Sequence, residues 1–81
     1  MNNKDFSKII SNRILSLKNE RNLTSEQLAY MSGISKGGLS EIERNMKEPR
    51  MFTLLKICAG LGIKMKDFFD FDEIDEFINT L

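Results

Sequence analysis

The 81-residue sequence contains no histidine, one cysteine and one proline. It also lacks a cysteine pair, a glycine-rich phosphate loop and a nucleophile elbow, so no residue set supports a hydrolase or another enzyme. The single Cys58 falls on an apolar helical stripe with Leu54, Leu55 and Leu61. We predict a buried structural thiol in a reducing compartment, and we expect no cofactor, metal ion or small-molecule ligand.

Long hydrophobic runs are absent as well. No stretch approaches the about 18 uninterrupted apolar residues of a membrane span, and the polar start Met1-Asn-Asn-Lys-Asp is not a signal peptide. These absences predict a cytoplasmic protein without a membrane partner. A chain of this length forms one small domain that buries only about 60% of its unfolded surface, so it needs a compact core or a partner.

Charge is balanced overall but divided along the chain. The twelve Lys and Arg residues all lie in positions 1–66, with six acids, which gives this part a net charge of +6. Positions 67–81 hold the other six acids and no base, a net charge of −6. A basic body suits a phosphate backbone, whereas the acidic end should face away from one.

Periodicity indicates helices from end to end. Phe6, Ile10, Ile14 and Leu17 recur at three- and four-residue steps in the first of them. The predicted fold is all-α, a compact bundle of about five short helices followed by a C-terminal amphipathic helix. The five are expected at residues 5–21, 25–31, 36–44, 51–61 and 65–69.

Local signals define the ends of these helices. Thr24 and Gln27 have the spacing of a capping box, and Ser35 is placed to cap the next helix. Gly33 is expected to stop the second helix in the left-handed conformation. Asn45 is the corresponding stop for the third.

The stretch Ser25–Arg44 has the geometry of two short helices that cross at a tight turn. Ala29 is small where the second helix would press against the first, and Gly33 sits at the corner. The residues expected to point inward are Leu28, Ile34, Leu39 and Ile42. This is the pattern of a helix-turn-helix, which presents its second helix to the DNA major groove.

From about Ile10 to Phe69 the chain resembles the lambda repressor and Cro-like helix-turn-helix family, also called Xre-type. The resemblance is carried by Leu17-Lys18, Leu23-Thr24, Leu28-Ala29, Gly33-Ile34-Ser35, Ile42-Glu43-Arg44, Pro49, Leu54-Leu55-Lys56-Ile57 and Leu61-Gly62-Ile63. It covers some three quarters of the sequence. The resemblance implies a DNA-binding transcriptional regulator that places the helix at 36–44 in the major groove.

Site residues follow from the resemblance position by position. The resemblance implies base reading by Lys36, Gly37, Gly38, Ser40 and Glu41. Phosphate binding is expected from Thr24, Ser25 and Ser35 at helix starts, and from the loop cations Arg44, Lys47 and Arg50. The family's clamp between the first and third helices would here be Lys18 with Glu43. A lysine is a point charge, so this clamp should be looser than one made by arginine.

Gly37-Gly38 departs from the expected pattern. Each glycine inside a helix costs about 0.8 to 1 kcal/mol relative to alanine, and the pair removes two side chains where base contacts usually originate. Either the bare backbone approaches DNA closely, or base reading has decayed and the helix serves a protein partner. We favour close approach, because three cations in the following loop have little purpose without DNA.

The C-terminal segment carries a narrow apolar stripe, Ile74, Phe77, Ile78 and Leu81, on an acidic background that Asp72 could cap. It divides the chain into a DNA-binding domain at 1–69 and a helix at 70–81. The stripe either folds back on the core or is shared with a second copy, and we favour a dimer interface. The acidic run lacks the glycine and ligand spacing of an EF-hand, so no calcium site is predicted.

The sequence therefore predicts a transcriptional regulator, a repressor, that binds double-stranded DNA as a homodimer. The main alternative is a protein-interaction module, such as an antitoxin or an anti-regulator, with weak or no DNA binding.

Overall fold

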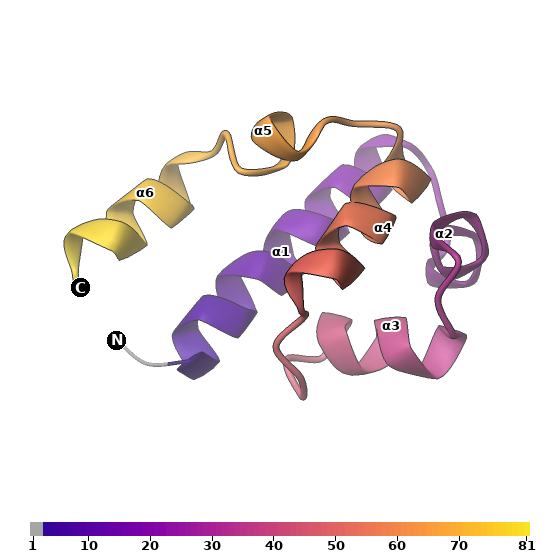
Figure 1. Ribbon diagram of the computed structural model, residues 1–81, viewed down its shortest axis with the longest axis horizontal. Helices are drawn as coiled ribbons and strands as arrows, with labels where there is room; N and C mark the ends of the chain where they lie inside the picture. The colour runs from indigo at the N-terminus through magenta and orange to yellow at the C-terminus, as the bar shows by residue number, and fades with distance from the viewer. Residues whose placement is uncertain (1–2) are drawn as a thin grey trace.

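Six α-helices and no strand make up residues 3–81, the part of the chain that the computed structural model describes (Figure 1). They are α1 (Asn3–Glu20), α2 (Ser25–Ser32), α3 (Lys36–Glu43), α4 (Met51–Leu61), α5 (Met65–Phe68) and α6 (Asp72–Asn79). The predicted all-α fold is confirmed. The bounds of α4 are those predicted, and those of α1, α2, α3 and α5 differ by one or two residues.

The helix ends follow the local signals in the sequence. The Thr24 hydroxyl accepts from the Gln27 amide while the Gln27 side chain accepts from the Thr24 amide, which is a complete capping box. Gly33 and Gly62 stop α2 and α4 with φ of 69° and 73°, in the left-handed region. Asn45 adopts φ of 62° just after α3, as predicted.

The core lies between α1 and the layer formed by α2, α3 and α4. In Figure 1, α1 runs along the molecule with α4 in front of it, α3 below and α2 at one end. Side chains from five helices meet there without measurable exposure: Ile10, Ile14, Leu28, Leu39, Ile57 and Phe68. None of the helices within residues 3–81 is long and apolar enough to cross a membrane.

α2 and α4 cross closely at Gly60. A Cβ built on this glycine would lie 2.1 Å from the Ser32 hydroxyl oxygen and 3.2 Å from the Met31 carbonyl carbon. The Ser32 hydroxyl is buried and has no hydrogen-bond partner among the described residues. The crossing thus leaves no room for a side chain at position 60. This constraint was missed in the sequence, where only Ala29 was identified as a small contact residue.

α6 packs back onto α1, which changes the expectation for the C-terminal stripe. Ile74 and Phe77 are buried in the chain's own core, and the Phe77 ring lies 5.8 Å from that of Phe6. Only Ile78 and Leu81 of the four stripe residues are exposed. The two buried members are therefore unavailable for the dimer interface that the sequence favoured, because α1 already covers them.

The start and end of α6 also differ from the prediction. Asp72 is the first helical residue and not the cap, a position that Phe71 occupies without a side-chain hydrogen bond. The Asp72 carboxylate still lies in the first turn, where the helix dipole favours negative charge. The helix ends at Asn79, so Leu81 lies beyond it.

The apolar stripe assigned to α4 needs one correction. Leu54, Leu61 and Cys58 are buried as predicted, but Leu55 points outward and is exposed. Leu54 and Leu55 are adjacent in the sequence, about 100° apart around a helix, so they cannot both face the core. Burial raises the pKa of the Cys58 thiol, which keeps it protonated and fits a structural role.

The close crossing of α2 and α4 generates a test of stability. Gly60→Ala should lower the free energy of unfolding by about 1 to 3 kcal/mol, because the added methyl overpacks a contact made partly by backbone. Urea titration followed by circular dichroism measures the change.

Gly37→Ala is the matched control for this substitution. Nothing lies within 4 Å of a Cβ at Gly37, so the same change there should stabilise the protein by about 0.8 to 1 kcal/mol through helix propensity. Equal effects at the two sites would contradict the assigned role of the crossing.

Candidate nucleic-acid interface

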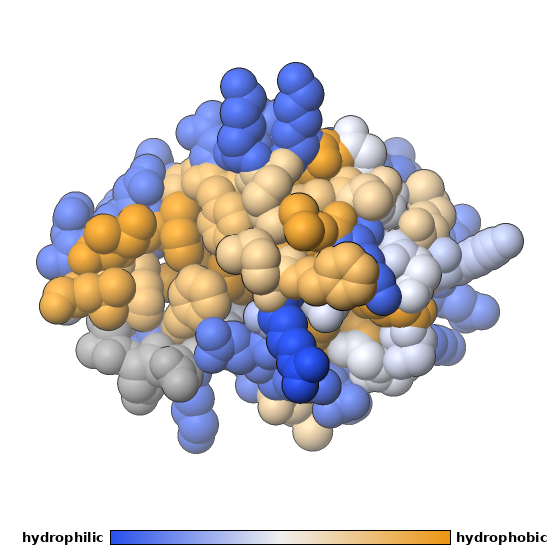
Figure 2. All heavy atoms as spheres, in the orientation of Figure 1, coloured by the Kyte–Doolittle hydropathy of each residue, from blue (hydrophilic) through white to orange (hydrophobic). Residues whose placement is uncertain are grey.

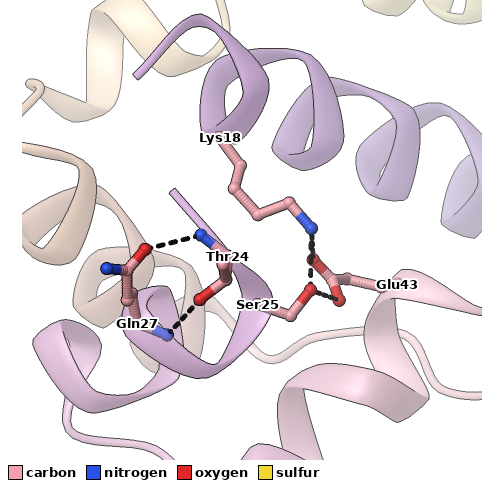
Figure 3. A network of polar contacts seen from close by, with 5 residues as sticks. All are labelled: Lys18, Thr24, Ser25, Gln27 and Glu43. Atoms are coloured by element: carbon pink, nitrogen blue, oxygen red, sulfur yellow. Dashed lines mark hydrogen bonds and ion pairs between the residues drawn. The ribbon is translucent and has the colours of Figure 1, made fainter. Parts of the chain in front are cut away.

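A triangle of polar contacts joins α1, α2 and α3 (Figure 3). Lys18 Nζ lies 3.0 Å from Glu43 Oε2 and donates to the Ser25 hydroxyl at 2.7 Å. The same hydroxyl donates to Glu43 Oε1 at 2.7 Å. The side chains of Lys18 and Glu43 are only 11% and 10% exposed. The predicted Lys18–Glu43 pair is therefore present, with Ser25 as a third member that the sequence did not indicate.

The resemblance implied that the Thr24 and Ser25 hydroxyls bind a phosphate. The Ser25 hydroxyl is occupied in the triangle, whereas the Thr24 hydroxyl only accepts in the capping box and keeps its own proton for donation. The start of α2 also has free backbone amides, because the first N–H groups of a helix have no intrahelical partner. A phosphate at this helix start would be bound by the Ser25 and Glu26 amides.

Ser35 has a capping role as well. Its hydroxyl accepts from the Gly38 amide at 2.9 Å and so begins α3. A Cβ on Gly38 would lie 2.9 Å from this hydroxyl, whereas Gly37 has open space around it. Gly38 therefore leaves room for the Ser35 cap, and Gly37 leaves the backbone of the first turn without a covering side chain.

The outward side of α3 presents the predicted base-reading residues. Lys36, Gly37 and Glu41 are exposed, and Gly38 and Ser40 are half-buried. Leu39 and Ile42 on the opposite side are in the core. The structure thus brings the five predicted residues to one accessible surface.

Lys36 has an acidic partner on the neighbouring helix. Its ammonium lies 3.4 Å from Glu26 Oε2, and the two side chains are 71% and 76% exposed. An ion pair this exposed stabilises by about 0 to 1 kcal/mol and is easily released. Glu26 was missed in the sequence, since no pattern links α2 to the first residue of α3.

The loop after α3 carries the predicted cations at its surface. Arg44, Lys47 and Arg50 are all exposed, while Pro49 is buried. The loop is anchored by the buried Ser11 of α1, whose hydroxyl donates to the Asn45 side-chain oxygen. Ser11 carries no sequence signal for this contact, because the two residues are far apart in the chain.

A surface hollow joins this loop to α3 and to the start of α4. Its lining consists of Ile34, Gly38, Ile42, Lys47, Pro49, Arg50 and Thr53. Lys47 and Arg50 therefore lie beside α3 and not merely after it in sequence. α4 begins here without a side-chain cap, so its first amides are a second set of free donors that could bind an anion.

Two other cations serve the fold. Arg13 donates to the carbonyls of Asp67 and Phe68 at the end of α5, each at 2.8 Å. Arg21 donates to the carbonyls of Leu61 and Leu17. With Lys18 they account for three of the twelve cations, and contacts within the chain hold these three side chains.

Two short helices held at a tight turn, with the second exposed, define a helix-turn-helix protein. The chain belongs to the helix-turn-helix family HTH_3, whose profile matches residues 14–68. This confirms the resemblance to the lambda repressor and Cro-like family.

Curated relatives include transcriptional regulators. The chain is 33% identical over 64 residues to the HTH-type transcriptional regulator SutR of Escherichia coli K12, covering 79% of this chain and 36% of SutR. It is 36% identical over 56 residues to the immunity repressor of Bacillus phage phi105, covering 69% of this chain and 39% of that protein. The chain thus spans well under half the length of these two relatives.

Solved structures show the same fold at similar identity. The restriction-modification controller protein C.Esp1396I superimposes with a TM-score of 0.76 at 31% identity, covering 79% of this chain and 82% of the controller. Its tetramer bound to a natural 35-base-pair operator matches with a TM-score of 0.76, at 31% identity and 79% and 84% coverage. An HTH_3 regulator from Vibrio cholerae matches with a TM-score of 0.79 at 34% identity, covering 84% of this chain and 38% of that one.

The triangle of Lys18, Ser25 and Glu43 predicts that a nearly isosteric substitution at Glu43 strongly lowers the stability of the fold. Glu43→Gln leaves the Lys18 ammonium in a shielded position without a counter-charge, so the free energy of unfolding should fall by about 3 kcal/mol. Replacing both residues, in Lys18→Met with Glu43→Leu, should cost less than Glu43→Gln alone. Thermal and urea unfolding measure both variants.

Glu20 supplies the control for this prediction. It pairs with Arg21 at 3.7 Å on the surface, and Glu20→Gln should change stability by less than about 0.5 kcal/mol. A Glu43→Gln effect as small as this would mean that the triangle does not hold the three helices.

Proposed function

We propose that the protein is a sequence-specific regulator of transcription, a repressor, that binds double-stranded DNA as a homodimer. Each copy inserts α3 into the major groove, and the two copies contact half-sites about 34 Å apart. Lys36 donates to guanine, and Ser40 and Glu41 contact neighbouring base edges. The amides at the starts of α2 and α4, with Arg44, Lys47 and Arg50, bind the flanking phosphates.

The hollow beside α3 carries this proposal. It brings Lys47 and Arg50 next to Gly38 of the reading helix and to an uncapped helix start. A helix in the major groove has a phosphate strand along each side. Cations and free amides are therefore found where that strand would run.

The comparisons support the same function. An immunity repressor and a regulator are among the relatives, and a solved neighbour is a controller protein on its operator. They favour DNA binding over the antitoxin-like alternative, and repression over activation. The operator complex contains a tetramer of that protein, which supports binding by more than one copy here.

Gly37 fits this proposal as a close-approach position. Its surroundings are open, so the bare first turn of α3 can lie nearer to the base edges than a turn with side chains could. The site then reads DNA with few side chains and with the shape of the groove.

Separate substitutions should distinguish base reading from phosphate binding. Lys36→Ala should weaken binding to the selected duplex by about 1 to 3 kcal/mol and leave binding to random duplex nearly unchanged. Lys47→Ala or Arg50→Ala should weaken both and reduce the salt slope by about 1. Fluorescence anisotropy across a salt series measures the affinities.

Lys66→Ala is the control for these cation changes. Lys66 is exposed on α5, which lies on the opposite side of the molecule from α3 (Figure 1), and its loss should leave the salt slope unchanged. If neither Lys36→Ala nor the loop variants alter affinity, the assigned roles are wrong.

The Glu26–Lys36 pair generates a further prediction. Glu26→Gln should raise affinity for the selected duplex by at most about fivefold, because the Lys36 ammonium is then free of an ion pair that stabilises by up to about 1 kcal/mol. In a Lys36→Ala background, the gain should shrink, since the carboxylate acts through that ammonium. An undiminished gain would show that Glu26 acts only by repelling phosphates.

Selection of bound duplexes from a random pool, with the mass of the complex measured, tests the proposed function itself. A palindromic sequence bound by two copies is the expected result, with a steep loss of affinity as salt rises. No enrichment, and little binding at moderate salt, would favour the protein-interaction module instead.

A further inference from the structure

A buried serine of α1 contacts the loop between α3 and α4. The Ser11 hydroxyl donates to the side-chain oxygen of Asn45, 34 residues further along the chain. Backbone bonds at the start of the loop run back to α3, since the amides of Asn45 and Met46 donate to the carbonyls of Ile42 and Glu41. Those bonds close the end of α3, whereas the Ser11–Asn45 contact fixes the loop relative to α1.

The backbone at Asn45 does not by itself require a side chain there. Asn45 lies in the left-handed region with φ of 62°. Glycine adopts this conformation with the least strain and is the usual residue just past a helix end. A glycine would therefore form the turn, and the asparagine adds an acceptor that reaches α1.

The Ser11–Asn45 contact lies between two of the loop cations. Arg44 stands one residue before Asn45 and Lys47 two residues after it, and both are exposed, as is Arg50. None of these three cations takes part in the ion pairs that residues 3–81 form, so the course of the backbone decides where their charges lie. Figure 2 shows strongly hydrophilic surface at the place of this loop, below the apolar surface over α4. A displacement of the loop would therefore move the charges that face an anionic partner.

The fold as a whole can lose this contact at little cost. Ser11 is 1% exposed, but its hydroxyl has a second acceptor, the Lys8 carbonyl at 3.1 Å. Asn45 is exposed, so water can replace the serine as its partner. Loss of the contact thus leaves no buried polar group without a hydrogen bond, which is the case that destabilises strongly. The consequence of the loss falls on the position of the loop.

We propose that Ser11 is a positioning residue for phosphate binding, which acts through Asn45 to hold Arg44 and Lys47 where the DNA backbone runs. The inference rests on the proposed function, because it concerns the phosphates that flank α3. Ser11 itself is too deeply buried to touch DNA, so its influence on affinity has to pass through the loop. A loop that is held in place before binding loses less conformational entropy on binding, which lowers the cost of forming the complex.

A double-mutant cycle followed by fluorescence anisotropy tests this role. Ser11→Ala should weaken binding to random duplex about three- to tenfold. The loss caused by Lys47→Ala, about tenfold in the unmodified protein, should fall below about threefold in the Ser11→Ala background, because the displaced loop no longer brings that cation to its phosphate. Lys36→Ala, measured on the selected duplex, should cost the same in both backgrounds. A general loosening of α3 would change both costs.

Asn45→Gly breaks the same contact from the other side and keeps the left-handed turn. Combined with Ser11→Ala, it should weaken binding no further than it does alone. Two matched controls should leave affinity within about twofold. Ser7→Ala alters a buried serine one helical turn earlier on α1, and Asn22→Gly alters another left-handed asparagine, with φ of 54°.

A measurement without DNA supplies an independent readout. Circular dichroism should show that Ser11→Ala is folded, while the ¹⁵N order parameters of residues 44–48 should decrease, as for a loop that is no longer held. The cycle with Lys47→Ala is repeated with Asn45→Gly in place of Ser11→Ala, so the test does not depend on the stability of one variant.

The outcomes separate this inference from the proposed function. If the unmodified protein does not bind duplex with a steep salt dependence, the proposed function is wrong and this inference falls with it. If the protein binds, but Lys47→Ala costs the same in every background, Ser11 does not position the loop and only this inference is overturned. Unchanged order parameters in Ser11→Ala would overturn it as well.

Discussion

Lys18, Ser25 and Glu43 form the one shielded ionic contact of the described chain, and the position of α3 depends on it. α3 contributes few residues to the core, chiefly Leu39 and Ile42, and its first turn is weakened by two glycines. A short helix of this kind has little stability of its own. The triangle ties its end to α1 and to the start of α2 through three contacts of 3.0 Å or less. The contacts that hold α3 therefore lie on its inward side, and the outward side, which is the proposed reading surface, stays accessible.

Much of the charge and polarity that the sequence presents is used internally. The hydroxyls of Thr24, Ser25 and Ser35 complete caps and the triangle, while Arg13 and Arg21 close helix ends. What remains for an anion is a smaller set of exposed cations and backbone amides, with the protons of the Thr24 and Ser35 hydroxyls, which only accept in their caps. Backbone amides at a helix start are free whatever side chains the residues carry. The sequence therefore indicates such an anion site only by showing where a helix begins.

Features governed by neighbouring residues could be predicted, and features governed by distant ones could not. The capping box of Thr24 and the left-handed turn at Gly33 depend on residues a few positions apart, and both are present. The close approach of Gly60 to Ser32 and the outward position of Leu55 depend on how the helices cross. An apolar stripe shows which residues are covered but not what covers them. The sequence therefore favoured a dimer interface for Ile74 and Phe77, which the chain's own core covers.

The proposed reading surface and the proposed binding by two copies explain each other. With Gly37 bare and Gly38 accommodating the cap, Lys36 is the one long side chain in the first turn of α3, and Glu26 holds it in the free protein. A single copy then discriminates weakly, since one good base contact contributes about 1 to 3 kcal/mol. Two copies joined rigidly double the number of contacts and convert the second binding event into an intramolecular one. A thin reading surface thus places a greater demand on binding by two copies.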